Sequence, residues 1–123
     1  MTSLASMQVA TIDCSEIRSK SELHKVIASS LILPDYYGHN WDALIDCLSY
    51  ANQPESGMIG FTIKSNEILV LRFRNIDVLN ASCPHCIAEL CVCISYVNRR
   101  FAGEHGSGCR VLVDFVSEPI DPC

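Results

Sequence analysis

Residues 36–46 carry the side chains of this chain that are best suited to chemistry with another molecule. Asp42 and Asp46 are four positions apart, so on a helix they lie on the same face, one turn apart. Ser49 continues that face, which lies beside the apolar stripe of the same helix. Two acids on one face, preceded by a loop with two tyrosines and a glycine, are typical of a surface that fits a positively charged site on another molecule.

The same acids have a plainer interpretation as a solvated helix face whose first-turn carboxylates suit the helix dipole. Glycosidase chemistry is another alternative, but it needs carboxylates on opposite sides of a cleft. Asp42 and Asp46 on one short helix point the same way. We therefore assign no catalytic residue, and we expect a binding protein rather than an enzyme.

A second candidate for chemistry is the run Cys83-Pro84-His85-Cys86, which is the motif of an oxidising thioredoxin-like active site. At a helix N-terminus the first thiol would gain acidity from the helix dipole. The motif comes late in the chain, after most of the expected elements, whereas thioredoxin-like folds place it after their first strands. The alternative interpretation is that Cys83 and Cys86 begin a buried helix as ordinary small residues.

The chain has eight cysteines and no secretion signal at its N-terminus, so we expect reduced thiols and a cytoplasmic location. A zinc site would need four ligands close together. The four candidates are spread along about 15 Å of one helix, too far for a single tetrahedral ion. These candidates are Cys83, Cys86, Cys91 and Cys93. No metal and no cofactor are expected.

Composition fits one globular domain over residues 1–123, with irregular tails at 1–6 and 117–123. No apolar run approaches the roughly 18 residues that cross a bilayer, so no membrane partner is expected. The net charge of −5, from fourteen acidic and nine basic side chains, argues against direct nucleic-acid binding. It suits a cationic protein partner, which it would attract at long range. Nothing in the sequence predicts the oligomeric state.

Hydrophobic periodicity and turn residues predict an α/β fold with a three-stranded, mainly parallel sheet packed by helices. Asn40 caps the acidic helix, Pro34 ends the helix before it, and His24 lies on that earlier helix's surface. An extra antiparallel strand is expected in the segment 52–66, where 58–64 reads as a strand and Ser65-Asn66 as a hairpin turn. The other predicted strands are 7–12, 68–73 and 110–116, and the predicted helices are 19–31, 40–48, 75–81 and one from Pro84 to Phe101.

Two motifs in order, Pro-x-Tyr-Tyr-Gly-x-Asn over 34–40 and Asp-Ala-Leu-x-Asp-Cys-Leu over 42–48, resemble the barstar family of ribonuclease inhibitors. The similarity is strong over 7–49 and continues more weakly at 68–73 and 108–113. It implies a small α/β inhibitor or bacterial immunity protein whose helix enters the active site of a cationic nuclease toxin. The carboxylates of that helix would replace substrate phosphate against arginine, lysine and histidine.

Carried over by position, the resemblance makes Asp46 the main anion, Asp42 a second charge and Tyr36 an aromatic contact. Gly38 and Asn40 would shape the loop. The full set of expected partner-binding residues is Tyr36, Gly38, His39, Asn40, Asp42, Ile45, Asp46 and Ser49.

This chain departs from the family pattern at four places, one of which is the segment 52–66, an insertion relative to the family. Ile45 stands where the family has an interface tryptophan, and His39 replaces an acid in the loop. On the last long helix the family places glutamates, where this chain has Asn98-Arg99-Arg100, with Glu104 further on. An adaptor of the same fold that binds a non-nuclease partner remains an alternative.

Overall fold

The computed structural model describes residues 6–103 and 108–117, and its centre is a parallel three-stranded sheet. The strands are β1 (Met7–Asp13), β2 (Ile68–Arg74) and β3 (Arg110–Val116), in the order β1-β2-β3. The register places Ala10 beside Leu71, and Leu71 beside Val113. Side chains alternate between the two faces, so one face carries the buried residues of the core. The predicted mainly parallel sheet is confirmed.

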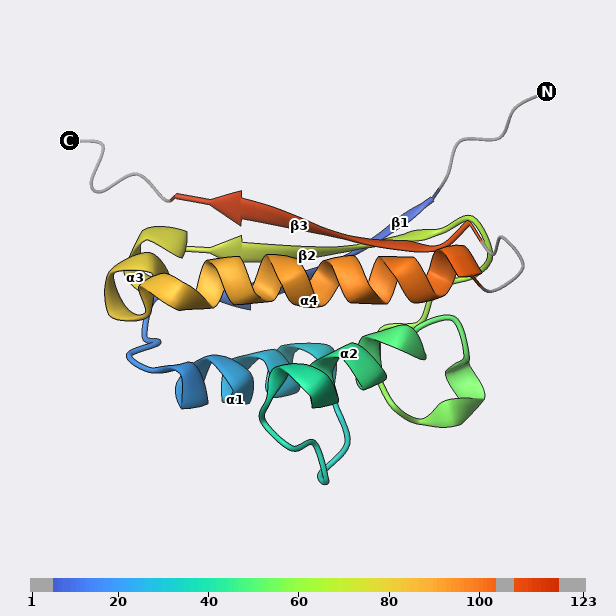
Figure 1. Cartoon of the computed structure of the whole chain (residues 1–123), viewed down its shortest axis with the longest axis horizontal. Coiled ribbons are helices and arrows are strands. Elements are labelled where there is room, and N and C mark those ends of the chain that lie inside the picture. The colour runs from blue at the N-terminus through green and yellow to red at the C-terminus, as the bar shows by residue number, and fades with distance from the viewer. Residues whose placement is uncertain (1–5, 104–107, 118–123) are drawn as a thin grey trace.

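Three helices lie on the same side of this sheet, α1 (Lys20–Leu31), α2 (Trp41–Ser49) and α4 (Pro84–Gly103), and a short helix, α3 (Ile76–Ser82), follows β2 (Figure 1). Their buried side chains and those of the inner sheet face form one core. Its largest fully buried members are Phe73, Phe101, Ile12, Ile17, Leu23, Ile27, Leu31, Leu44, Leu48, Leu69, Leu71 and Leu79.

Local sequence determines where α1 begins and ends. The Ser19 hydroxyl accepts a hydrogen bond from the Glu22 backbone N–H at 3.2 Å, which caps the first turn. The Glu22 carboxylate reaches back to the backbone N–H of Arg18, one residue before the cap, at 2.8 Å. At the other end Ile32 adopts a left-handed conformation with φ of 54°, and its N–H bonds to the Ala28 carbonyl. The helix therefore ends at Leu31, three residues before Pro34.

The predicted antiparallel strand is wrong. Residues 52–66 form one short 3₁₀ turn, η1 (Pro54–Ser56), and otherwise irregular backbone. The segment is held by single hydrogen bonds to helix ends, from the Gly60 N–H to the Leu31 carbonyl at 2.9 Å and from the Ile63 N–H to the Ala51 carbonyl at 2.8 Å. These bonds pair the N–H groups of Gly60 and Ile63 outside any strand ladder, and the buried Ile63 side chain packs into the core.

The turn at Ser65-Asn66 does form, but it leads directly into β2 instead of closing a hairpin. The Glu67 N–H bonds to the Lys64 carbonyl at 3.0 Å, and the Glu67 carboxylate accepts from the Lys64 N–H at 2.9 Å. The buried Glu67 carboxylate also accepts from the Ser6 hydroxyl at 2.6 Å. These bonds fix the start of β2 beside the start of β1.

The expectation that all cysteines are reduced is wrong for one pair, because Cys83 and Cys86 form a disulfide. Their Cα atoms are 5.5 Å apart at the first turn of α4, a separation that a disulfide spans. Among the other cysteines of the described residues, Cys91 is exposed, and the buried ones are Cys14, Cys47, Cys93 and Cys109. Those four behave as small apolar residues, as expected.

Across the described ranges no single helix could span a membrane. The pair α3 and α4 taken together passes the same test of length and composition, but it is bent by 113° at the break between the helices. The ends of the two expected tails, 1–5 and 118–123, lie outside the described residues, as does Glu104.

Candidate partner-binding face

The acidic helix α2 begins at a well-formed cap. The Asn40 side-chain oxygen accepts from the Ala43 backbone N–H at 2.8 Å, and its amide nitrogen donates to the Gly38 carbonyl at 3.2 Å. One side chain therefore holds both the first turn of α2 and the loop before it. A β-carbon added at Gly38 would lie 3.1 Å from that amide nitrogen, so a larger residue would crowd the cap.

The two tyrosines of the loop face opposite ways. Tyr36 is 73% exposed and donates its hydroxyl to the Met58 sulfur at 3.2 Å. Tyr37 is buried, and its hydroxyl oxygen lies 2.6 Å from Nδ1 of His24 on α1. Burial raises the pKa of the Tyr37 hydroxyl well above its usual value. Tyr37 therefore ties the loop to the core, while Tyr36 remains available at the surface.

His24 corrects the expectation of a surface histidine, since it is fully buried between Tyr37 and Trp41. Burial, aided by the charges of His39 and Lys20, lowers the pKa of His24 to about 4, so the ring is neutral at pH 7. The spacing of His24, Ile27 and Leu31 is that of one helix face, and this pattern could have placed His24 in the core.

Asp42 and Asp46 are both exposed on α2, one turn apart. Asp46 forms an ion pair with Arg100 of α4, with 3.1 Å between Nη1 and Oδ1. The two side chains remain 59% and 50% exposed, so the pair is solvated and weak. Asp42 has no ion-pair partner within the described part of the chain. The acidic face is therefore accessible.

The remaining expected contact residues differ in how far their side chains are exposed. His39 is exposed with a left-handed φ of 56°, and its ring lies 5.2 Å from that of Tyr37. Ile45 is half-buried at the border of the face. Ser49 is only 5% exposed and donates its hydroxyl to the Ile45 carbonyl at 2.6 Å while accepting from Arg100 at 3.3 Å. Ser49 thus positions Arg100 and offers little surface of its own.

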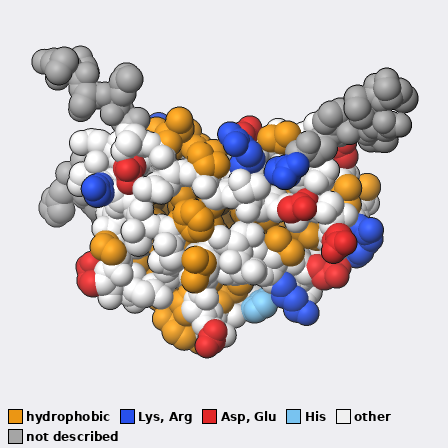
Figure 2. All heavy atoms as spheres, turned by 180° about the vertical axis from the view of Figure 1, so that it is seen from behind, with side chains coloured by type: hydrophobic (Ala, Val, Ile, Leu, Met, Phe, Trp, Pro, Cys, Tyr) orange, Lys and Arg blue, Asp and Glu red, His pale blue; other side chains and the backbone are white. Residues whose placement is uncertain are grey.

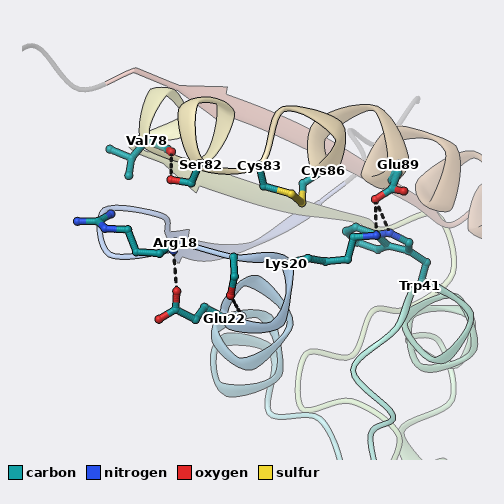
Figure 3. The surroundings of a disulfide bond; sticks show 10 residues. Arg18, Lys20, Glu22, Trp41, Val78, Ser82, Cys83, Cys86 and Glu89 are labelled. Carbon is teal, nitrogen blue, oxygen red and sulfur yellow. Dashed lines mark hydrogen bonds and ion pairs between the residues drawn. A yellow bond between two sulfur atoms is a disulfide. The ribbon is translucent and has the colours of Figure 1, made fainter.

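A polar cluster that the sequence did not reveal fixes the start of α2 against its neighbours (Figure 3). The Trp41 indole donates to the Glu89 carboxylate at 3.0 Å, and Lys20 pairs with the same carboxylate at 2.8 Å. These two donors hold the pKa of Glu89 below its usual value. The residues come from α2, α4 and α1, so Glu89 links all three helices. Glu89 and Lys20 are 69 positions apart, and no local pattern predicts their contact.

The disulfide lies where α3 ends and α4 begins, and Figure 3 shows it on the same stretch of α4 as Glu89. Cys86 is fully buried and Cys83 is half-buried. Among the described residues no group of three histidine, cysteine or acidic side chains is arranged to hold a metal ion.

On the side of the molecule opposite the view of Figure 1, acidic and basic side chains are interspersed among hydrophobic ones (Figure 2). That face of the described structure therefore lacks the continuous basic patch that nucleic-acid-binding proteins use.

A family model described as barstar, the barnase inhibitor, matches residues 7–114. The match runs from the first residue of β1 to within the last strand, and it includes the loop, α2 and all the helices described above. The chain therefore belongs to the barstar family.

Proposed function

We propose that this chain is an inhibitor of a nuclease toxin, acting as an immunity protein in the bacterial cytoplasm. Proteins of its family inhibit ribonucleases such as barnase. The observation that carries the proposal is that Asp42 and Asp46 project from one capped, core-packed helix and are both exposed. The chain would act by occlusion and would perform no catalysis itself.

The rigid support of α2 favours this mode of binding. The Asn40 cap, the Tyr37–His24 contact and the Trp41–Glu89 bond hold the carboxylates in place before the partner arrives. A preorganised face loses little conformational entropy on binding. The cations of a nuclease active site that meet Asp42 and Asp46 would be desolvated, so each would need its carboxylate partner.

Asp46 supplies the first test, with barnase as the probe nuclease. We expect Asp46→Ala to weaken inhibition of RNA cleavage by about 3 kcal/mol or more, because the substitution leaves a buried cation without its partner. The matched control is Glu16→Ala, which removes an exposed acid in the β1–α1 connection, far along the chain from the loop and α2. Equal losses for the two variants would contradict the proposal.

The disulfide favours a second candidate function, thiol–disulfide exchange at Cys83 and Cys86. In this reaction a substrate dithiol reduces the bridge, two electrons pass to the cysteine sulfurs, and the substrate leaves as a disulfide. Cys83 is the more exposed residue of the pair, so its sulfur would be attacked first. An insulin-reduction assay tests it: dithiothreitol is the dithiol that reduces the Cys83–Cys86 bridge, and the two thiols then reduce an insulin disulfide and return to the bridge. Activity that Cys83→Ser abolishes would support this function, and no activity above the reductant alone would eliminate it.

A further inference from the structure

A furrow runs between α2 and α4 beside the acidic face. Its first part is a hollow of about 370 Å³ whose walls are almost entirely apolar. Val92 and Tyr96 of α4 both line it and are 56% and 47% exposed, so two large apolar side chains meet solvent in one hollow. The other lining residues are Trp41, Asp42, Ile45, Ala88, Glu89 and Cys93.

Cys93 is a buried member of this lining. Burial, with a smaller contribution from the charge of Asp42, raises the pKa of the Cys93 thiol to about 12. Cys93 therefore stays protonated and acts as an apolar surface. Ile45 borders this space from the α2 side and adds an apolar side chain to its wall.

The second part of the furrow is basic. A hollow of about 350 Å³ is lined by Arg99 and Arg100 and shares Asp42, Ile45 and Tyr96 with the first. The shared lining makes the two hollows one continuous furrow, apolar at one end and cationic at the other. Its edge is the same α2 that carries Asp42 and Asp46.

Arg99 and Arg100 differ in their partners. Arg100 already pairs with Asp46. The Arg99 guanidinium carbon lies 5.6 Å from the centre of the Tyr96 ring, and no carboxylate of the described residues lies within ion-pair distance of Arg99. Arg99 is thus an exposed cation beside an aromatic ring, and Asp42, the acid that lines the same hollow, forms no ion pair with it.

We propose that the α2–α4 furrow is part of the partner-binding face and receives a segment of the nuclease in which a bulky apolar side chain lies two residues from a carboxylate. The apolar side chain would enter between Ile45, Val92 and Tyr96, and the carboxylate would pair with Arg99. The inference rests on the proposed function and adds the chemistry of the partner. The nuclease would present this segment beside the cations that meet Asp42 and Asp46.

Helix and strand geometry together support the two-residue spacing. The middle of the Val92–Tyr96 pair is about five residues from Arg99, or roughly 8 Å along α4. In an extended segment, side chains two residues apart lie on the same side and about 7 Å apart. An apolar residue and an acid at that spacing therefore match the furrow's two ends.

Three capped peptides test the furrow directly by NMR titration of the full-length protein. Acetyl-Leu-Gly-Glu-amide should shift the backbone amide signals of Ile45, Val92 and Tyr96 in a saturable way. Replacing Glu by Lys should weaken binding about three- to fivefold, as loss of an exposed ion pair allows. Replacing Leu by Gly should weaken it at least as much. Shifts that do not saturate, or that are equal for the three peptides, would overturn the proposal.

A charge reversal gives the sharper test. In Arg99→Glu the preference should invert, so that the Lys peptide binds more tightly than the Glu peptide. The control, Lys25→Glu, makes the same change of net charge on an exposed residue of α1, and it should keep the original preference. If both variants behave alike, the peptides respond only to total charge and the inference is wrong.

These titrations involve no nuclease, so they fail separately from the inhibitor proposal. If the peptides bind as expected but Asp46→Ala does not weaken inhibition, the furrow is upheld as a binding site and the nuclease-inhibitor proposal is rejected. An effective Asp46→Ala with no furrow binding would reject the furrow alone.

Discussion

At the scale of single residues, His24 and Tyr37 connect the core to the candidate binding face. The neutral ring of His24 meets the Tyr37 hydroxyl at 2.6 Å, and its Nε2 is buried without a hydrogen-bond partner among the described residues. Protonation would place a charge in this enclosed position. The loop that presents Tyr36 therefore depends on a residue that must stay uncharged.

This contact gives a pH prediction. The pKa of His24 is about 4 in the folded protein and near 6.5 when unfolded, so the unfolded state binds the proton first. Its contribution to stability is complete above pH 6.5 and is lost as the pH falls towards 4. Between pH 7 and 4.5 we expect the free energy of unfolding to drop by about 2 kcal/mol from this residue.

Urea unfolding at the two pH values measures this change, with His24→Gln as the comparison. The amide of glutamine does not titrate, so the variant should be less stable at pH 7 but should lose less stability on acidification. Identical pH dependence in the two proteins would show that His24 is not responsible. Asp13, Glu67 and Glu89, whose pKa values are lowered, lose most of their contribution below pH 4.5, and they contribute equally in the wild-type protein and the variant.

At the scale of elements, short-range patterns predicted most of the framework. The serine cap of α1, the asparagine cap of α2 and the apolar runs of β1, β2 and β3 act within a few residues, so the sequence displays them directly. The strand prediction for 58–64 was wrong because a short apolar run does not by itself specify a strand. Its side chains can also be buried from irregular backbone that packs beneath the helices. The expected site residues gather on the loop and α2, although Ser49 is buried.

The cap of α2 gives a prediction at this scale. Asn40→Ala removes the acceptor for the Ala43 N–H and the donor to Gly38, and should lower the free energy of unfolding by about 1 kcal/mol. Asn40→Asp keeps the acceptor and adds a charge that the helix N-terminus favours, so it should stay near the wild-type value. Urea denaturation distinguishes them. An Asp variant as unstable as the Ala variant would assign the effect to the Gly38 bond.

At the scale of the whole molecule, contacts between residues far apart in the chain determine which side chains of α4 lie beside the acidic face of α2. Local sequence patterns do not predict these contacts. Arg100 reaches Asp46 across 54 positions, and Glu89 reaches Trp41 across 48. Both contacts join α4 to α2, and they arise only once the parallel sheet has brought the helices together. The resemblance to the family predicted the positions of Asp42 and Asp46. The arginines at one end of the furrow, Arg99 and Arg100, come from α4, and no local pattern predicted that they would lie beside these acids.

Net charge supplies the last prediction. A chain with a net charge of −5, and with Asp42 and Asp46 exposed, should attract a cationic nuclease before contact. In stopped-flow mixing with barnase, the association rate should fall at least about tenfold as ionic strength rises from about 0.05 to 0.5 M, because salt screens attraction beyond a few ångströms. Dissociation, governed by short-range contacts already desolvated, should change much less. If salt changed mainly the dissociation rate, the acidic face would hold the bound partner without attracting it from a distance. The proposed effect of net charge on association would then be wrong.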